Sequence, residues 1–105
     1  MQRRRIQIFG RYYILKFVAN LGKYLGHCDH PDAPQKEIRI KKGQAPKDEL
    51  DTIIHEVTHA ADFTKSESWV AVFSKDLTEI LWALGYRRLT KEEIKEWEQN
   101  HPNNP

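Results

Sequence analysis

The sequence predicts a small α+β domain, in which an antiparallel sheet packs on a helical hairpin that is followed by a short helix. β-forming residues dominate the chain up to about residue 42, and apolar residues at helical spacing dominate the rest. Strands that precede helices in this way are typical of the α+β class. The 105 residues have room for one core, so we expect a single domain over residues 1–100 and a disordered tail over residues 101–105.

The strands are expected in two regions of the first part of the chain. β-forming residues cluster over residues 4–18, where Gly10 separates two runs. We interpret them as two strands, or as one strand followed by an element that could be a strand or a helix. Charged and apolar residues alternate over residues 36–42, which is typical of a half-exposed strand and favours a place at the edge of the sheet. Between these regions, residues 26–34 are rich in Gly, Asp and Pro and predict a loop.

Two helices joined by a short connection follow the strands. The first should run from about residue 46 to 63, because Pro46 suits a first helical turn and apolar residues recur every three or four positions. Ser66 is a good N-cap for the second helix, which we expect to end near Leu84. Its apolar side is predicted to hold Val70, Phe73, Leu77, Leu81 and Leu84. The short connection favours two antiparallel helices in contact.

A third helix is predicted near the C-terminus. Thr90 and Glu93 have the spacing of a capping box, in which two side chains satisfy backbone N–H groups at the start of a helix. The helix should extend toward Gln99.

Composition limits the partners and the compartment. The net charge of +2 is too small to indicate nucleic acid, so we expect no nucleic-acid partner. Cys28 is the single cysteine, so the chain cannot form an internal disulfide, which fits the cytoplasm. No stretch approaches the roughly 20 apolar residues of a membrane span, and we expect no membrane partner. The sequence leaves the oligomeric state open.

The first predicted helix contains the motif H-E-x-x-H, formed by His55, Glu56 and His59. Residues four apart lie on one face of a helix, so the two imidazoles can bind one Zn²⁺ ion. Glu56 follows the first histidine and can reach the attacking water without being a metal ligand. The motif therefore predicts a zinc site in which Glu56 acts as the general base.

A catalytic zinc site needs a third protein ligand. The candidates are the other acidic and imidazole side chains near the motif, namely Asp62, Glu67, Asp76, Glu79, His27 and His30. Glu67 is favoured, because it lies in the first turn of the second helix, nearest the C-terminal end of the motif helix. Asp62 is about 10 Å along the axis from His55, so it suits a partner of a ligand imidazole better than a ligand. Glu79 and Asp76 point away from the apolar side of their helix.

Other interpretations of these residues stay open. Glu67 can instead stabilise the helix N-terminus through the helix dipole, with no role at a metal. His27, Cys28 and His30 can form a separate metal cluster, although so tight a spacing does not close a structural zinc shell by itself. For Cys28, a small and half-buried side chain is the simpler interpretation.

Residues 49–86 resemble the minimal gluzincin-type zinc metallopeptidases, including small phage and bacterial proteins. The residues that match are His55, Glu56, His59 and Glu67. The second predicted helix is similar to the ligand helix of the ImmA/IrrE metallopeptidases, which opens with a metal-binding glutamate. Residues 37–40 are similar to the edge strand on which such enzymes lay out a peptide. The resemblance implies Zn²⁺ as the cofactor, with His55, His59 and Glu67 as its ligands.

These patterns lead to one leading hypothesis on function. It is a zinc-dependent peptidase that cleaves peptide bonds in a peptide or protein added to the edge strand 36–42, with Glu56 as the general base. Tyr86 and His27 are both candidates for the group that stabilises the oxyanion.

Two alternatives accompany it. One is a zinc-stabilised regulatory or binding module without catalysis, which captures a partner strand through the same edge. The other is a DNA-linked protease domain of the SprT-like kind.

Overall fold

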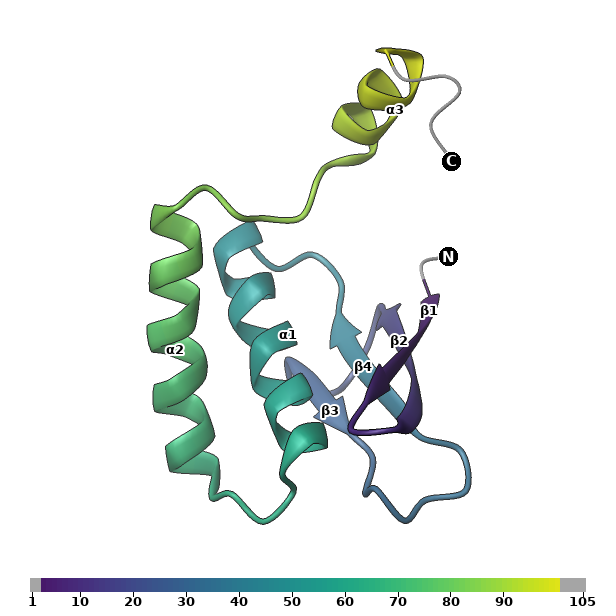
Figure 1. Ribbon diagram of the computed structural model, residues 1–105, viewed down its shortest axis with the longest axis vertical. Coiled ribbons are helices and arrows are strands. Elements are labelled where there is room, and N and C mark those ends of the chain that lie inside the picture. Colours follow the sequence, from purple (N-terminus) through teal and green to yellow (C-terminus); the bar gives the residue numbers. More distant parts are fainter. Residues whose placement is uncertain (1–2, 101–105) are drawn as a thin grey trace.

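The computed structural model describes residues 3–100, so the tail predicted over residues 101–105 lies outside the described residues. Four strands precede three helices, in agreement with the predicted α+β class (Figure 1). In chain order the elements are β1 (Arg3–Ile8), β2 (Arg11–Val18), β3 (Gly26–Cys28), β4 (Glu37–Lys41), α1 (Pro46–Ala61), α2 (Glu67–Ala83) and α3 (Lys91–Asn100). The predicted helices are confirmed to within two residues at their ends.

The sheet is mixed, so the expectation of an entirely antiparallel sheet was wrong. Its strand order is β1-β2-β4-β3. β1 and β2 form an antiparallel hairpin, and β3 is antiparallel to β4. β2 and β4 are parallel, with Leu15 opposite Ile38 and Phe17 opposite Ile40. The parallel pair arises because the chain leaves β2, forms β3 at the far edge, and turns back between them as β4.

Strand β4 is an inner strand, so the prediction that residues 36–42 form an edge was wrong. It pairs with β2 on one side and with β3 on the other. The charged residues of β4 lie on the face of the sheet turned away from α1, where Glu37 contacts Lys16 at 2.8 Å and Arg39 at 2.9 Å. The alternating charges therefore reflect an open face of the sheet. The edge strands are β1 and β3, and β3 occupies part of the predicted loop 26–34.

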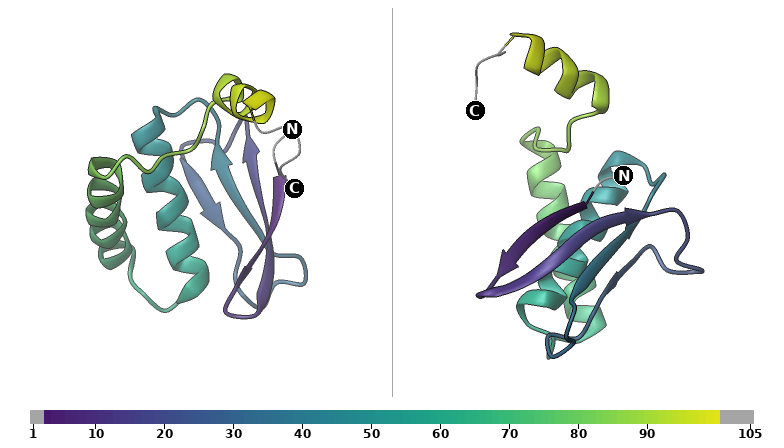
Figure 2. Two further views of the ribbon diagram at one scale, coloured as in Figure 1. Left: turned by 45° about the horizontal axis from the view of Figure 1, so that its top comes forward. Right: turned by 90° about the vertical axis from the view of Figure 1, so that its right-hand side faces the viewer.

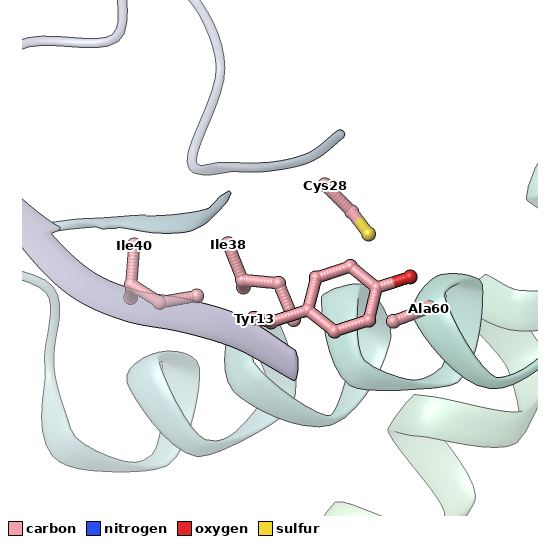
Figure 3. Close-up of a cluster of buried hydrophobic side chains, with 5 residues drawn as sticks. All are labelled: Tyr13, Cys28, Ile38, Ile40 and Ala60. Carbon is pink, nitrogen blue, oxygen red and sulfur yellow. The ribbon is translucent and has the colours of Figure 1, made fainter. Parts of the chain in front are cut away.

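The hydrophobic core lies between the sheet and α1. Tyr13, Ile38 and Ile40 are fully buried there, together with Cys28 and Ala60 (Figure 3). The Tyr13 ring extends from β2 across the end of Ile38 toward Ala60 of α1. Each large aliphatic side chain buried in this way contributes about 1.5–3 kcal/mol to folding. The core thus fixes α1 against the strands and sets the position of its H-E-x-x-H motif.

Helix α2 packs on α1, so sheet, α1 and α2 form three successive layers (Figure 2). The residues that α2 buries are Val70, Ser74 and Thr78, which recur every four positions. Phe73 and Leu84 are 41% and 68% exposed, so the predicted apolar side was rotated from the true contact face. The prediction followed hydrophobicity alone, whereas small polar side chains at the contact let the two helices approach closely.

Helix α3 stands apart from these layers (Figure 1). Its predicted capping box is confirmed, because the Glu93 N–H donates to Thr90 Oγ1 and the Thr90 N–H donates to Glu93 Oε1. Across residues 3–100, no helix combines the length and the apolar character needed to cross a membrane.

Candidate functional site

Helix α1 presents its two motif histidines on the side that faces the start of α2. Pro46 and the acidic first turn of α1 start the helix, and Thr52, Glu56 and Ala60 form its buried face. His55 and His59 lie on the neighbouring face, with ring centroids 4.9 Å apart. Their side chains are 20% and 12% exposed, so both rings are held largely inside the protein.

Glu67 is brought to these histidines by the tight turn between α1 and α2. The Ser66 side chain caps α2 by accepting a hydrogen bond of 3.2 Å from the Trp69 N–H. Glu67 is therefore the first residue of α2, and it lies close to the angular position of the buried Ser74. This places its carboxylate over the C-terminal half of α1, as the sequence predicted.

The carboxylate of Glu67 lies between the two imidazoles. Its Oε2 atom is 3.2 Å from Nε2 of His55, and its Oε1 atom is 2.5 Å from Nε2 of His59. One donor atom from each of the three residues lies within 4.8 Å of the others. Among the described residues, this is the one group of three or more His, Cys, Asp or Glu side chains with donor atoms close enough to share a metal ion.

Imidazole nitrogen and carboxylate oxygen are both ligand types that zinc accepts. Two ligands at about 2.1 Å from one tetrahedral ion are about 3.4 Å apart, so the His55 contact of 3.2 Å is near this value and the His59 contact of 2.5 Å would have to lengthen. Nε2 of His59 is buried, and within residues 3–100 no group meets it with the geometry of a hydrogen bond, despite its short distance to Glu67. A buried nitrogen without a hydrogen bond is costly, and a cation shared with Glu67 would satisfy it.

Glu56 lies beside this group but points toward the sheet. It is only 8% exposed, between α1 and β3. Burial raises the pKa of its carboxyl above the usual range, and the charge of Glu67 adds to this effect. The imidazoles of His55, His59 and His27 act in the opposite direction. A raised pKa makes this carboxylate a stronger base than an exposed glutamate.

A cavity of about 720 Å³ opens over the motif. It is lined by β3 and the residues before it, by the motif face of α1, and by Phe63, Lys65 and Glu67. His27 lines this cavity, and its Nε2 atom is 2.9 Å from Oδ1 of Asp29. Tyr86 is the other candidate for the group that stabilises the oxyanion. It follows the end of the 17-residue helix α2 that is opposite Glu67, about 25 Å from Glu67. The structure therefore leaves His27 as the better-placed of the two.

Several other sequence candidates serve different purposes. Asp62 does not support a ligand imidazole, because its carboxylate accepts hydrogen bonds from the N–H and the hydroxyl of Thr64. These bonds hold the turn before α2 and lower the pKa of Asp62. Glu79 is 2.8 Å from Lys47 at the opposite end of the helical hairpin. Neither carboxylate belongs to the group formed by His55, His59 and Glu67.

The loop cluster His27, Cys28 and His30 does not converge on a common point. His27 contacts Asp29, and Nδ1 of His30 accepts a hydrogen bond from the Asp32 N–H. Cys28 is buried, and burial, with the negative charges of Glu56 and Asp29, raises the pKa of its thiol to about 12. The thiol therefore stays protonated at neutral pH and belongs to the core.

Strand β3 is the part of the site that the sequence did not predict. Its three residues have no alternating pattern, and their strand character comes from pairing with β4. Gly26 lies against Glu56, and Thr52 of α1 lies beside both. A glycine next to a histidine in a turn-rich segment gives no signal of such a contact.

Comparisons of this chain with known protein families, with characterised proteins and with solved structures find no match.

Proposed function

We propose that this chain is a zinc-dependent peptidase, with His55, His59 and Glu67 as the metal ligands and Glu56 as the general base. The observation that carries the proposal is the convergence of three zinc-type donor atoms beside a buried carboxylate, in the wall of an open cavity.

The chemistry divides between the metal and the protein. When bound, Zn²⁺ supplies a Lewis acid that polarises the substrate carbonyl and lowers the pKa of water toward about 7. Glu56 accepts a proton from the attacking water, whose oxygen forms a bond to the carbonyl carbon. Glu56 then delivers this proton to the amide nitrogen as the C–N bond breaks, so that one water is consumed and a carboxyl and an amine are released.

The substrate is an extended peptide added to β3, the true edge beside the cavity. Leu25 O accepts a bond from the Lys41 N–H, and the Asp29 N–H donates to Glu37 O. Because antiparallel pairing alternates, the backbone groups of Gly26 and Cys28 point away from β4. These groups can pair with a peptide by β-strand addition. This replaces residues 36–42 as the peptide-binding edge.

His27 is the residue we assign to the developing oxyanion. It is one of the residues that line the cavity, it belongs to the same edge strand, and its Nε2 atom contacts Asp29. A donor placed where negative charge develops lowers the barrier to attack.

Cleavage of a library of unstructured peptides by the zinc-loaded protein tests the proposal. Glu56→Gln keeps the size of the side chain but removes the base, so cleavage should fall by at least about 10²-fold. The zinc content should stay the same. Glu92→Gln, an exposed glutamate of α3, is the matched control and should retain full activity.

Two results would contradict the proposal in different ways. A zinc-loaded wild type that cleaves no peptide would favour a binding module in place of an enzyme. A Glu56→Gln variant that cleaves as fast as wild type would show that another group acts as the base.

A further inference from the structure

Strand β3 and helix α1 meet at Gly26, where there is no room for a side chain. A Cβ atom built on Gly26 would lie 2.8 Å from Cγ of Glu56, 2.8 Å from its Oε2 atom and 2.8 Å from Cγ2 of Thr52. Non-bonded carbon atoms prefer separations of about 3.5–4.0 Å. The backbone of the edge strand therefore lies directly against the carboxylate of the general base.

We infer that Gly26 is a positioning residue for catalysis: its missing side chain lets the Glu56 carboxylate take up the place from which it serves as the base. This inference rests on the proposed function, because it gives Glu56 the role assigned to it above. Gly26 lies 30 positions before Glu56 in the chain and outside the H-E-x-x-H motif, so the inference adds a residue to the proposed site.

The neighbours of Gly26 are held in place. Thr52 is 8% exposed, and its hydroxyl contacts Gln44 Oε1 at 2.8 Å and the Asp48 carbonyl at 3.0 Å. Glu56 is equally buried. The strand itself is anchored to β4 on both sides of Gly26, by the bond from the Lys41 N–H to Leu25 O and the bond from the Asp29 N–H to Glu37 O. An added methyl group would therefore displace the Glu56 side chain or push β3 away from α1.

Steric contact, and not backbone conformation, explains the glycine at position 26. The other four glycines, Gly10, Gly22, Gly43 and Gly85, all have positive φ angles and open space where a Cβ would lie. Gly26 has the opposite combination, a backbone that any residue adopts and three atoms in the way. Alanine is favoured over glycine in a strand, so without this contact Gly26→Ala would be neutral or stabilising.

The contact couples two parts of the site. The outward backbone groups of β3 receive the peptide in the proposed function, and the inward side of the same residue touches the base. Gly26 thus determines the distance between the bound peptide and the Glu56 carboxylate. A misplacement of about 1 Å can cost as much as 10²-fold in rate.

The first test compares the kinetics of the zinc-loaded wild type and Gly26→Ala. We expect kcat to fall by at least about 10-fold, while KM changes by less than about twofold and the zinc content is unchanged. KM should hold because the new methyl group points toward α1 and leaves the peptide-binding edge free. An active wild type with an unchanged kcat in Gly26→Ala would overturn the inference and leave the proposed function standing. An inactive wild type would overturn both.

The second test is independent of activity and uses the melting temperature of the metal-free chain. Gly26→Ala should lower it in the wild-type background. In the Glu56→Ala, Thr52→Ser background, which lacks the contacting atoms, the same change should have no effect or raise it. An equal decrease in both backgrounds would mean that the glycine does not act through Glu56, and the inference would fail.

Discussion

Two glutamates of the site have opposite surroundings, and these surroundings support the different roles proposed for them. Glu56 is 8% exposed, and burial raises the pKa of its carboxyl. The side chain of Glu67 is 77% exposed and lies against two imidazole nitrogens. A buried carboxylate without a cationic partner is suited to exchange a proton, whereas a carboxylate that faces two imidazoles is suited to complete a cation site.

The role of Glu67 can be tested against a second glutamate of the same helix. Glu67→Ala should weaken zinc binding by more than about 10-fold, because it removes a ligand and not merely a supporting group. Glu79→Ala should leave the affinity unchanged, since Glu79 contacts Lys47 at the other end of α2. A competition titration with a chelator measures both. Equal zinc affinities in the two variants would show that Glu67 is not a ligand.

The raised pKa of Glu56 has a consequence for stability in the metal-free protein. The folded state holds the Glu56 proton more tightly than the unfolded state, whose carboxyl pKa is about 4.3. Folding therefore loses stability as the pH rises from about 4.3 through the raised pKa. Glu56→Gln has no carboxyl to lose its proton and so avoids this loss of stability. The melting temperature of the variant should therefore exceed that of wild type by the largest amount at neutral pH.

Thermal melts in the presence of a chelator from pH 4 to pH 8 provide the measurement. The difference between Glu56→Gln and wild type should shrink as the pH falls toward about 4. A difference that does not change with pH would show that burial does not perturb this carboxyl.

At the scale of elements, the α1–α2 turn determines where Glu67 lies. Asp62 fixes the turn through Thr64, and Ser66 caps the first turn of α2. These are local interactions between residues close in sequence. For that reason the start of α2, and the position of Glu67 in it, could be predicted from the sequence.

Removal of the cap should therefore weaken both folding and metal binding. Ser66→Ala should lower the free energy of unfolding by about 1 kcal/mol, because it leaves an N–H group in the first turn unsatisfied. Zinc affinity should fall with it, since the first turn carries Glu67. Ser66→Asn keeps a capping oxygen and serves as the control in the same denaturant and chelator titrations. A Ser66→Ala variant with unchanged zinc affinity would show that the cap does not position Glu67.

The strands were less predictable than the helices, for physical reasons. β3 has three residues, and its conformation depends on pairing with β4, which follows it by about ten residues. The alternating charges of β4 correctly indicated a solvent-exposed face. They could not indicate which strands lie on either side, because strand order depends on contacts between distant parts of the chain.

At the scale of the molecule, the site lies where three layers meet. β3 belongs to the sheet, the motif histidines to α1, and Glu67 to α2. The sequence predicted the part of the site formed by the two helices, because helical angles place their residues. It did not predict the approach of β3 to Glu56, which depends on how the sheet packs on α1. The packing of all three layers is therefore a condition for the proposed chemistry.

The proposed function depends on the claim that His55, His59 and Glu67 bind one zinc ion, which elemental analysis measures. Protein purified without chelator should contain one zinc per chain. His55→Ala and His59→Ala should each lose it, because each removes a donor from the triad. His30→Ala, which removes a histidine outside the triad, should retain it. A wild type without bound metal, or full zinc content in both triad variants, would contradict the claim.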